Sequence, residues 1–399
     1  MNQVRCPQGL KIENNEAKME EQTKRSEIPH IRISDFDYSL PPELIAQTPI
    51  ELRDASRLLV VHRTTGTFEH RHFRDIGAYL RPGDLLVANQ SRVLPARLLG
   101  HRVETGGAVE VLLLAERPDL GPDYWETLVR PGRRLRQGSR IIFGDENGAK
   151  QAALLQAEIL ERTEAGGRIV HFSVVARYSL QEERGQNQLA LNVSVRELIE
   201  QLGRMPLPPY IHETLKDPER YQTVYARITG SAAAPTAGLH FTPHLLEHLR
   251  QQGIRIGFVT LHVGLDTFRP VESEDIREHK MHSEEIDLDA PTAELINETR
   301  RAGGRIVAVG TTVVRVLESV ASFHEGRIEP YHGVTRLFIT PGYRFQVIDA
   351  MITNFHLPRS TLLLLVSSFA GKALIEKAYQ EAIRERYRFY SFGDAMLIL

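Results

Sequence analysis

From about residue 190 to the C-terminus, segments with the pattern of buried strands alternate with segments with the pattern of helices. The clearest strand patterns are two apolar runs, at 254–263 and 305–309, which are typical of parallel strands covered on both faces. The helical patterns lie at 243–252, 291–302, 313–322 and 372–387. The first of them begins after Thr242, a favoured N-cap residue, and ends at Gly253. This alternation predicts an α/β fold with a mixed open sheet flanked by helices.

Between residues 92 and 175 the pattern changes to short apolar segments separated by turn residues. The segments lie at 108–114, 125–129, 140–143, 154–160 and 167–174. No long helical pattern interrupts them, which is typical of a small antiparallel β-barrel. We therefore predict an inserted β-barrel domain over 91–179 and an α/β catalytic domain made of 31–90 and 180–399. Residues 1–30 have mixed charge and little to bury, so we expect a disordered tail there.

Cysteine usage and hydropathy exclude several classes of protein. The only cysteine among the 399 residues is Cys6, which excludes an intrachain disulfide, a cysteine zinc site and an iron–sulfur cluster. The longest apolar run, 361–370, is about half as long as a membrane-spanning helix. We expect it to be a buried helix, and we see no signal peptide. These features predict a cytoplasmic protein that is not bound to a membrane.

Positive charge is concentrated in two places, although the formal net charge is only −2. Residues 130–140 contain five arginines and no acidic residue, and 384–392 interleave cations with aromatic rings. Cations attract phosphates and rings stack on unpaired bases, so both segments suit RNA. The alternatives are a solvated hairpin for the first segment and ordinary core aromatics for the second.

Polar residues follow the two predicted strands at the edge where ligands bind in sheets of this kind. His262 lies at the end of the strand at 254–263, and Gly310 and Thr311 open the helix after the strand at 305–309. The amides of that helix start could hold an anion, although an ordinary α/β turn is the alternative. Residues 204–242 form a long stretch with little periodicity, which in a compact domain is typically functional.

Histidines repeat at several positions but do not form a recognised metal signature. His240, His244 and His248 are spaced by four residues, and His279 and His282 lie near acidic residues. Neither group has the arrangement of a zinc protease motif, so we predict no metal site. Dinucleotide-binding, P-loop and α/β-hydrolase motifs are also absent from the sequence.

Many short segments together resemble one family, the S-adenosylmethionine:tRNA ribosyltransferase-isomerases of queuosine biosynthesis. These segments are 37–46, 53–58, 82–87, 91–97, 205–211, 234–242, 260–264, 267–271, 279–282, 309–312, 353–358 and 390–396. They occur in order from about residue 33 to the C-terminus, so the resemblance covers all but the first thirty residues. It implies an α/β domain with an inserted β-barrel, as the hydrophobic pattern also predicts.

The resemblance implies a particular reaction. The family transfers the ribosyl part of S-adenosylmethionine to 7-aminomethyl-7-deazaguanine at the tRNA wobble position and isomerises it. The product is epoxyqueuosine, and adenine and methionine are released. The donor is consumed as a co-substrate, so no further cofactor is expected. The implied partners are the donor and a tRNA anticodon stem-loop, and we expect a monomer.

Four residues at matching family positions are candidates for catalysis: His240, His262, Asp349 and His356. Our hypothesis is that one histidine removes the proton beside the sulfonium and another assists the departure of adenine, while Asp349 orients a histidine or the substrate amine. For each histidine a structural role is the alternative. The candidates for substrate binding are Arg97, Tyr225, Thr236, Gly238, Thr267, Arg269, Gly310, Thr311, Arg315 and Asn354.

Binding roles follow from charge within this set. Arg315 or the helix start at Gly310 suits the carboxylate of the donor. Arg97 and the arginines of 130–140 are candidates for contacts with anticodon-loop phosphates. Asp266 departs from the family pattern, in which a glycine is usual, and this puts the local loop geometry in doubt.

Two other classes of protein remain as alternatives. A methyltransferase would need a glycine-rich turn after its first strand, which 56–65 does not offer, and it would leave S-adenosylhomocysteine. A non-enzymatic RNA-binding protein with this fold would bind tRNA without consuming the donor. The products formed from the donor distinguish all three.

Overall fold

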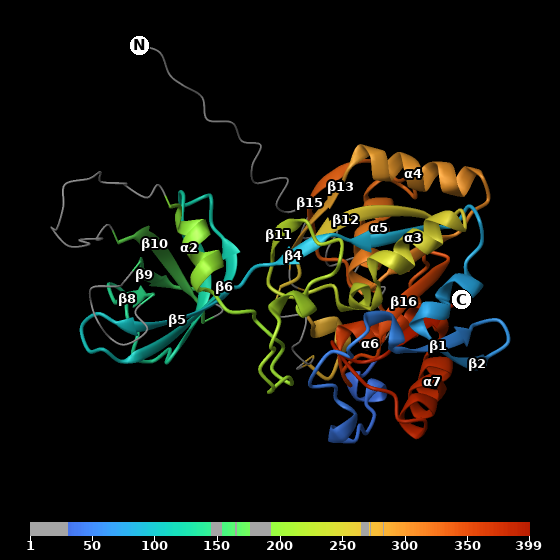
Figure 1. Cartoon of the computed structure of the whole chain (residues 1–399), viewed down its shortest axis with the longest axis horizontal. Coiled ribbons are helices and arrows are strands. Elements are labelled where there is room, and N and C mark those ends of the chain that lie inside the picture. Colours follow the sequence, from blue (N-terminus) through green and yellow to red (C-terminus); the bar gives the residue numbers. More distant parts are fainter. Residues whose placement is uncertain are drawn as a thin grey trace, which may run out of the picture.

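The fold has two parts, a mixed sheet with helices on both faces and a closed β-barrel (Figure 1). The computed structural model describes residues 31–144, 154–163, 166–175, 193–264, 271, 273–281 and 283–399. The sheet has nine strands and the barrel has six, all of them antiparallel in the barrel. The predicted fold class is therefore confirmed.

The four central strands of the sheet run parallel, and the strands outside them pair antiparallel with one exception. In spatial order the strands are β15 (Tyr331–Thr335), β13 (Glu284–Leu288), β12 (Arg255–Leu261), β3 (Leu85–Asn89), β14 (Ile306–Val309), β16 (Ala350–Asn354), β17 (Ala395–Ile398), β1 (Arg57–His62) and β2 (Thr67–His72). The exception is the pair β17 and β1, which are parallel to each other. The strands β12, β3, β14 and β16 are parallel, with Leu85 of β3 opposite both Arg255 and Ile306. Their carboxyl ends therefore lie together at one edge of the sheet.

Side chains alternate between the two faces of these strands, and each face packs on its own layer of helices. Val87 and Ala308 belong to the core formed with α4 (Ala290–Arg301), α5 (Thr311–Phe323), α6 (Thr361–Ala370) and α7 (Lys372–Arg384). Leu86 and Val307 belong to the core on the other face, formed with α3 (Pro243–Gln251) and the 3-10 helix η4 (Phe73–Tyr79). Each fully buried aliphatic side chain contributes about 1.5–3 kcal/mol, so these two layers dominate stability.

Local signals fix where the helices begin. The Thr242 hydroxyl accepts a hydrogen bond from the Leu245 amide at 3.0 Å, so α3 begins at the predicted N-cap. Ser360 caps α6 in the same way through the Leu363 amide at 3.2 Å. The apolar run at 361–370 is a buried helix, as predicted. Within the described ranges, no helix is both long and apolar enough to span a bilayer.

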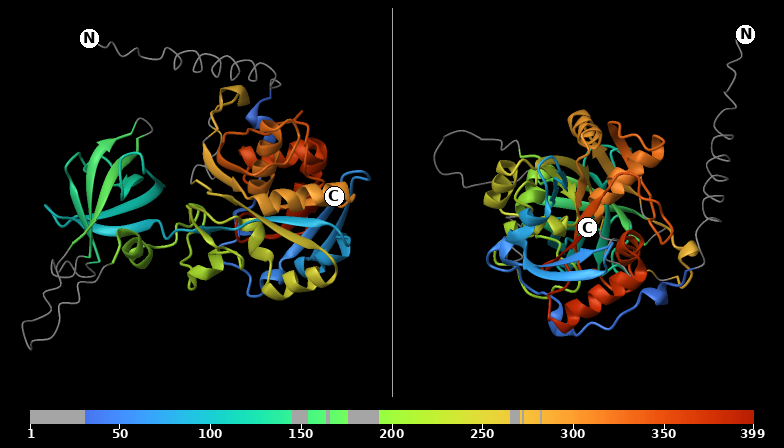
Figure 2. Two further views of the ribbon diagram at one scale, coloured as in Figure 1. Left: turned by 90° about the horizontal axis from the view of Figure 1, so that it is seen from above. Right: turned by 90° about the vertical axis from the view of Figure 1, so that its right-hand side faces the viewer.

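The barrel strands are β5 (Arg97–Arg102), β6 (Ala108–Glu116), β7 (Tyr124–Arg130), β8 (Arg140–Phe143), β9 (Leu155–Arg162) and β10 (Arg168–Val174). They close in the order β10-β7-β6-β5-β8-β9 around a core of their own, which α2 (Val195–Leu202) joins through Leu198 and Ile199. The barrel stands to one side of the sheet in the left view of Figure 2. The main chains of Arg97 and Arg204 exchange hydrogen bonds of 3.1 and 2.8 Å where the chain enters and leaves the barrel.

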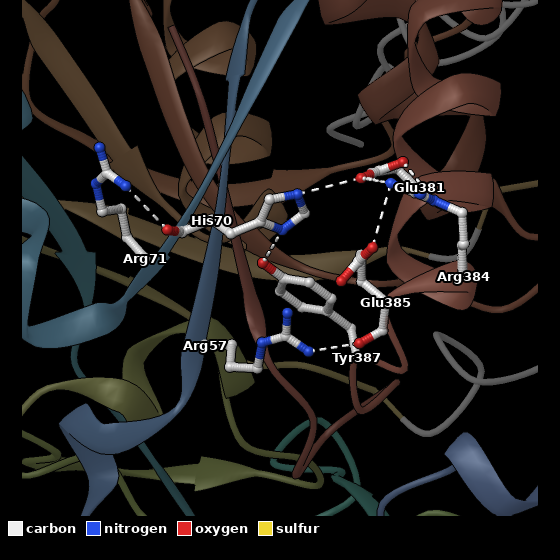
Figure 3. Close-up of polar contacts among 7 residues, drawn as sticks. All are labelled: Arg57, His70, Arg71, Glu381, Arg384, Glu385 and Tyr387. Carbon is white, nitrogen blue, oxygen red and sulfur yellow. Dashed lines mark hydrogen bonds and ion pairs between the residues drawn. The ribbon is translucent and has the colours of Figure 1, made fainter.

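Polar contacts attach α7 and the residues after it to the edge strand β2 and its neighbour β1 (Figure 3). The His70 ring contacts the Tyr387 hydroxyl at 2.8 Å and the Glu381 carboxylate at 3.1 Å. The Arg57 guanidinium lies 3.8 Å from the centre of the Tyr387 ring and donates to the Glu385 carbonyl oxygen at 2.6 Å. These contacts give part of the aromatic, cationic segment 384–392 a structural role, as the alternative to RNA binding predicts.

Candidate active site

Two adjoining cavities lie at the carboxyl edge of the parallel strands. The larger, of about 1070 Å³, lies between the sheet and the barrel, so that His262 faces it from one side and Leu128 from the other. The smaller, of about 60 Å³, lies beyond the ends of β14 and β16. Val263 and Leu362 line both cavities, which are therefore neighbours. This is the edge at which ligands bind in α/β sheets.

His262 follows directly after β12 and faces the larger cavity. Its Nδ1 is buried and has no hydrogen-bond partner among the residues that the structure describes. Burial lowers the pKa of His262, and the nearby Glu285 carboxylate partly opposes this. A Cβ added to Gly230 would lie 2.8 Å from the His262 ring, so the ring position requires glycine at 230.

His356 follows β16 and lines the smaller cavity. Its Nε2 lies 2.7 Å from the Thr353 hydroxyl. One buried and one partly buried tyrosine fix its main chain, because the His356 amide donates to the Tyr379 hydroxyl at 2.9 Å and the Tyr38 hydroxyl donates to the His356 carbonyl oxygen. Burial lowers the pKa of His356 to about 3, so the ring is neutral at pH 7.

Asn354 lines the smaller cavity, and His240 lies behind it. The Asn354 amide donates to the Tyr390 carbonyl oxygen at 3.0 Å, whereas its Oδ1 is buried without a partner in the described part of the chain. The His240 Nδ1 lies 2.7 Å from the Ser56 hydroxyl and its ring stacks on Phe73 with centroids 5.0 Å apart. Burial lowers the pKa of His240 to about 4, against an opposing effect of Asn354. His240 is therefore neutral at pH 7 and lies close enough to Asn354 to be affected by it.

The start of α5 forms the floor of the smaller cavity. Gly310 is its N-cap, with φ of 94°, a conformation that favours glycine. Gly310 and Thr311 line this cavity, as their position at a strand end predicts, and Thr236 from the long stretch 204–242 lines it with them. The free amides at the start of this helix give the cavity a positive electrostatic potential.

Arg315, one turn further along α5, lines the larger cavity and forms an ion pair with Glu284 of β13. Both side chains are buried, and burial lowers the pKa of Arg315 to about 10. The Arg315 Nε also donates to the Leu337 carbonyl oxygen at 3.3 Å. Its Nη2 is buried and lacks a partner within the ranges that the structure covers. An anion in the cavity could therefore still be bound by Arg315.

The other predicted binding residues lie elsewhere. Tyr225 and Gly238 pack together in the core, where a Cβ on Gly238 would lie 2.1 Å from the Tyr225 hydroxyl oxygen. Arg97 forms an ion pair with Glu110 at 3.3 Å on the barrel. Thr267 and Arg269 lie outside the described residues, as do Asp266 and His282.

Asp349 lies at the amino end of β16, at the opposite edge of the sheet from His356. Its carboxylate accepts a hydrogen bond from the Ile306 amide at 2.7 Å, and its carbonyl oxygen accepts one from Arg63 at 2.7 Å. The structure therefore does not bring Asp349 together with His262 and His356, and both its contacts hold the start of β14 and β16.

Several residues of the site carried no signal in the sequence. Ser56 and the two tyrosines that hold His356 act through single hydrogen bonds to residues 23 to 318 positions away, which no local pattern reveals. Thr353 is only three positions from His356, but its contact depends on the turn after β16, which the sequence pattern does not indicate. Glu284 follows an acidic, histidine-containing segment but is identifiable only by its contact with Arg315. In the described residues, no group of three His, Cys, Asp or Glu side chains could hold a metal ion.

The fold and site define an α/β protein whose histidine-lined cavity lies between its sheet and an inserted β-barrel. A family model described as queuosine biosynthesis protein matches residues 33–398, and the chain belongs to this family. It is 57% identical over 369 residues to proteins named S-adenosylmethionine:tRNA ribosyltransferase-isomerase from Symbiobacterium thermophilum and Moorella thermoacetica. Each match covers 92% of this chain and 100% of the relative. The resemblance noted in the sequence is thus confirmed.

A solved structure is also similar to this chain. The crystal structure of S-adenosylmethionine tRNA ribosyltransferase from Thermotoga maritima is 41% identical in sequence. The match covers 92% of this chain and 100% of that chain, with a TM-score of 0.49.

Proposed function

We propose that this protein transfers the ribosyl part of S-adenosylmethionine to 7-aminomethyl-7-deazaguanine at the tRNA wobble position and isomerises it. The products are epoxyqueuosine-tRNA, adenine and methionine. The donor is consumed as a co-substrate, so the reaction needs no further cofactor. The family and the names of the two relatives support this class of enzyme. The single cysteine supports action in the reducing cytoplasm, and we propose that the enzyme acts there as a monomer.

The observation that carries the proposal is the cavity of about 1070 Å³ with, in its wall, a histidine nitrogen that has no partner among the described residues. This volume is at the upper end for small-molecule sites, so it offers room for the donor and for one extruded nucleotide. Acidic side chains also line it: Glu116, Glu126, Glu278, Glu284 and Glu285. Two of these carboxylates, Glu116 and Glu284, are paired with Arg196 and Arg315, which also line the cavity. The charge of the other three favours the two cationic groups of the reaction, the sulfonium of the donor and the aminomethyl group of the base.

His262 is the residue that we propose as the base. The proton to be removed lies on the carbon beside the sulfonium, which the positive charge acidifies, so a moderate base in a fixed position is sufficient. The neutral imidazole of His262 has a free acceptor position at Nδ1 and Glu285 nearby, whose charge stabilises the imidazolium that forms. His356, with a pKa of about 3, is a much weaker base.

His356 and Asn354 are then suited to hydrogen bonding rather than proton removal. Because the His356 ring stays neutral, it cannot act as a strong acid, but it can donate or accept a hydrogen bond as adenine departs. The unpaired Oδ1 of Asn354 can accept from an amino group of the donor. We propose that Arg315 binds the methionine carboxylate through its Nη2, with the start of α5 as the alternative.

The test is incubation of the purified protein with S-adenosylmethionine and an anticodon stem-loop that carries 7-aminomethyl-7-deazaguanine. Mass spectrometry of the products is expected to give free adenine, methionine and an RNA heavier by an epoxycyclopentanediol unit. S-adenosylhomocysteine with a methylated RNA would instead identify a methyltransferase. Binding of the RNA by folded protein without any product would indicate a binding protein and would contradict the proposed function.

A further inference from the structure

One face of the barrel carries unpaired positive charge. We call the side chains of Arg130, Arg133, Arg134, Arg136 and Arg162 the arginine surface. All five residues are exposed, and none has an ion-pair partner in the portion of the chain that the structure describes. By contrast, Arg97 and Arg140 on the same barrel face Glu110 and Glu104. Uncompensated arginines on a protein of net charge −2 are a local feature rather than a consequence of composition.

A buried arginine holds the frame on which this surface is built. Arg168 of β10 is 9% exposed and donates to the carbonyl oxygens of Gly166 and Gly167 at 3.1 and 2.8 Å. It also donates to the Gly132 carbonyl oxygen at 2.8 Å, which links two loops of the barrel. The loops border an open hollow of about 690 Å³ whose rim includes Arg133, Arg136 and Arg162, with Glu161 as its one carboxylate among the described lining residues. The arginine surface is therefore presented on a fixed backbone.

This hollow lies next to the active-site cavity, on the other side of one short piece of chain. Gly166 lines the hollow, and the next residue, Gly167, lines the cavity of about 1070 Å³. The barrel wall inside the cavity has the opposite charge, since Glu116 and Glu126 face it. Glu116 forms an ion pair with Arg196 at 3.0 Å, whereas Glu126 has no ion pair within 4.0 Å among the residues that the structure describes. The barrel thus presents cations outside the cavity and carboxylates within it.

We propose that the arginine surface binds the phosphodiester backbone of the RNA substrate beside the reacting nucleotide, while the base alone enters the cavity. This inference rests on the proposed function. Phosphates are attracted to the arginines and repelled by the carboxylates, so the charge pattern separates backbone from base. Arginine suits this role because its guanidinium binds phosphate oxygens in a bidentate geometry.

The experiment compares the unmodified anticodon stem-loop bound by wild type, by the double variant Arg133→Gln/Arg136→Gln and by a matched control, Arg74→Gln/Arg81→Gln. The control arginines are exposed and lie in and after η4, on the sheet part of the protein. Fluorescence anisotropy over a range of salt concentrations gives Kd and its salt slope. Thermal unfolding checks that all three proteins are folded.

We expect the double variant to raise Kd at least ~5-fold and to reduce the slope of log K against log salt by about 1.4–1.8, as the loss of two phosphate contacts requires. The control should keep the wild-type Kd and slope. A double variant with the wild-type Kd and slope would overturn the proposal. Since no donor is present, the result does not depend on turnover, and failure of the proposed function would be recognised separately by absent products.

Discussion

The two ends of the parallel strands differ in how completely their polar groups are paired. At the amino end, the Asp84 carboxylate binds the Arg305 guanidinium at 2.6 Å and accepts hydrogen bonds from the amides of Arg81 and Arg305 at 2.8 and 3.1 Å. At the carboxyl end, the Asn354 Oδ1 and the His262 Nδ1 are buried without partners in the residues described. The same strands β3, β12, β14 and β16 thus end in a closed network on one side and in an open site on the other.

The paired groups at the amino end contribute to stability, whereas the unpaired groups at the carboxyl end are available for function. Burial alone would raise the pKa of Asp84, but the hydrogen bonds from Arg305 and Arg81 outweigh it and the pKa is lowered. Asp84 is therefore stabilised as an anion in the folded state. At the other end, burial keeps His240 and His356 neutral and leaves hydrogen-bonding capacity unused. Unsatisfied groups of this kind lower stability and are expected where a ligand completes them.

The largest expected effect is on activity at the carboxyl end. His262→Ala should lower kcat/KM for adenine release by about 10²–10⁴-fold, the typical contribution of a general base. The matched control is His244→Ala, an exposed histidine on α3, which should leave activity unchanged. Wild-type activity of His262→Ala would exclude His262 as the base.

The same residue predicts the pH dependence of the reaction. The pKa of His262 is lowered, so the ring is already neutral above the ordinary histidine value of about 6.5. Activity should therefore be constant around neutral pH and fall only as the pH drops below that value and the base becomes protonated. A pH profile of kcat/KM whose acid limb lies well above pH ~7 would contradict this assignment.

At the amino end the largest expected effect is on stability. Asp84→Asn should lower the free energy of unfolding by about 2–3 kcal/mol at pH 7, because the Arg305 cation loses its partner. Turnover should be unaffected in the folded variant. Since the folded pKa of Asp84 is lowered, its contribution is present above the unfolded value of about 3.9 and is lost as the pH falls through the folded value. Urea unfolding of both proteins should therefore give converging stabilities below pH ~4.

A smaller effect should come from the tyrosines that hold His356. Tyr379→Phe removes the acceptor of the His356 amide and should lower kcat by roughly 10-fold, with little change in KM for RNA, because a small misplacement of a catalytic group is costly. Tyr387→Phe is the control, since its hydroxyl contacts His70 rather than the site. Equal kcat values for the two variants would show that the Tyr379 hydroxyl does not position His356.

The smallest effect should come from His70, a partly exposed residue that contacts the Tyr387 hydroxyl and the Glu381 carboxylate away from the site (Figure 3). His70→Ala removes a hydrogen bond to Tyr387 and a partly exposed ion pair with Glu381, so it should cost no more than about 1 kcal/mol. Activity should be unchanged. A loss of turnover in this variant would mean that the packing of α7 on the sheet affects the site.

Much of the fold could be predicted because strong local patterns coincide with real elements. Helices α3 to α7 and strands β12 and β14 were predicted near their observed bounds, as were five of the six barrel strands. The strand β5 was missed because it has charged ends and a central glycine, and β16 because it is short and unflanked by turn signals. The pairing that closes the barrel depends on contacts between distant segments, which periodicity does not encode.

The failure to predict β16 explains why only some residues of the candidate site could be placed from the sequence. Residues after strand ends, such as His262 and Gly310, could be assigned to the carboxyl edge because β12 and β14 were recognised. Without β16, the sequence could not reveal that Asp349 precedes a strand and His356 follows it. Buried contacts such as His240 with Ser56 were also beyond reach, because 184 positions separate the two residues.

The most direct test of this account compares the two ends of β16. Adenine release in a single turnover is measured for His356→Ala and for Asp349→Ala, with folding checked by thermal unfolding. The account predicts that His356→Ala loses at least about 100-fold in rate, whereas Asp349→Ala, once folded, stays within about threefold of wild type. A loss as large in Asp349→Ala as in His356→Ala would contradict the assignment of chemistry to the carboxyl edge alone.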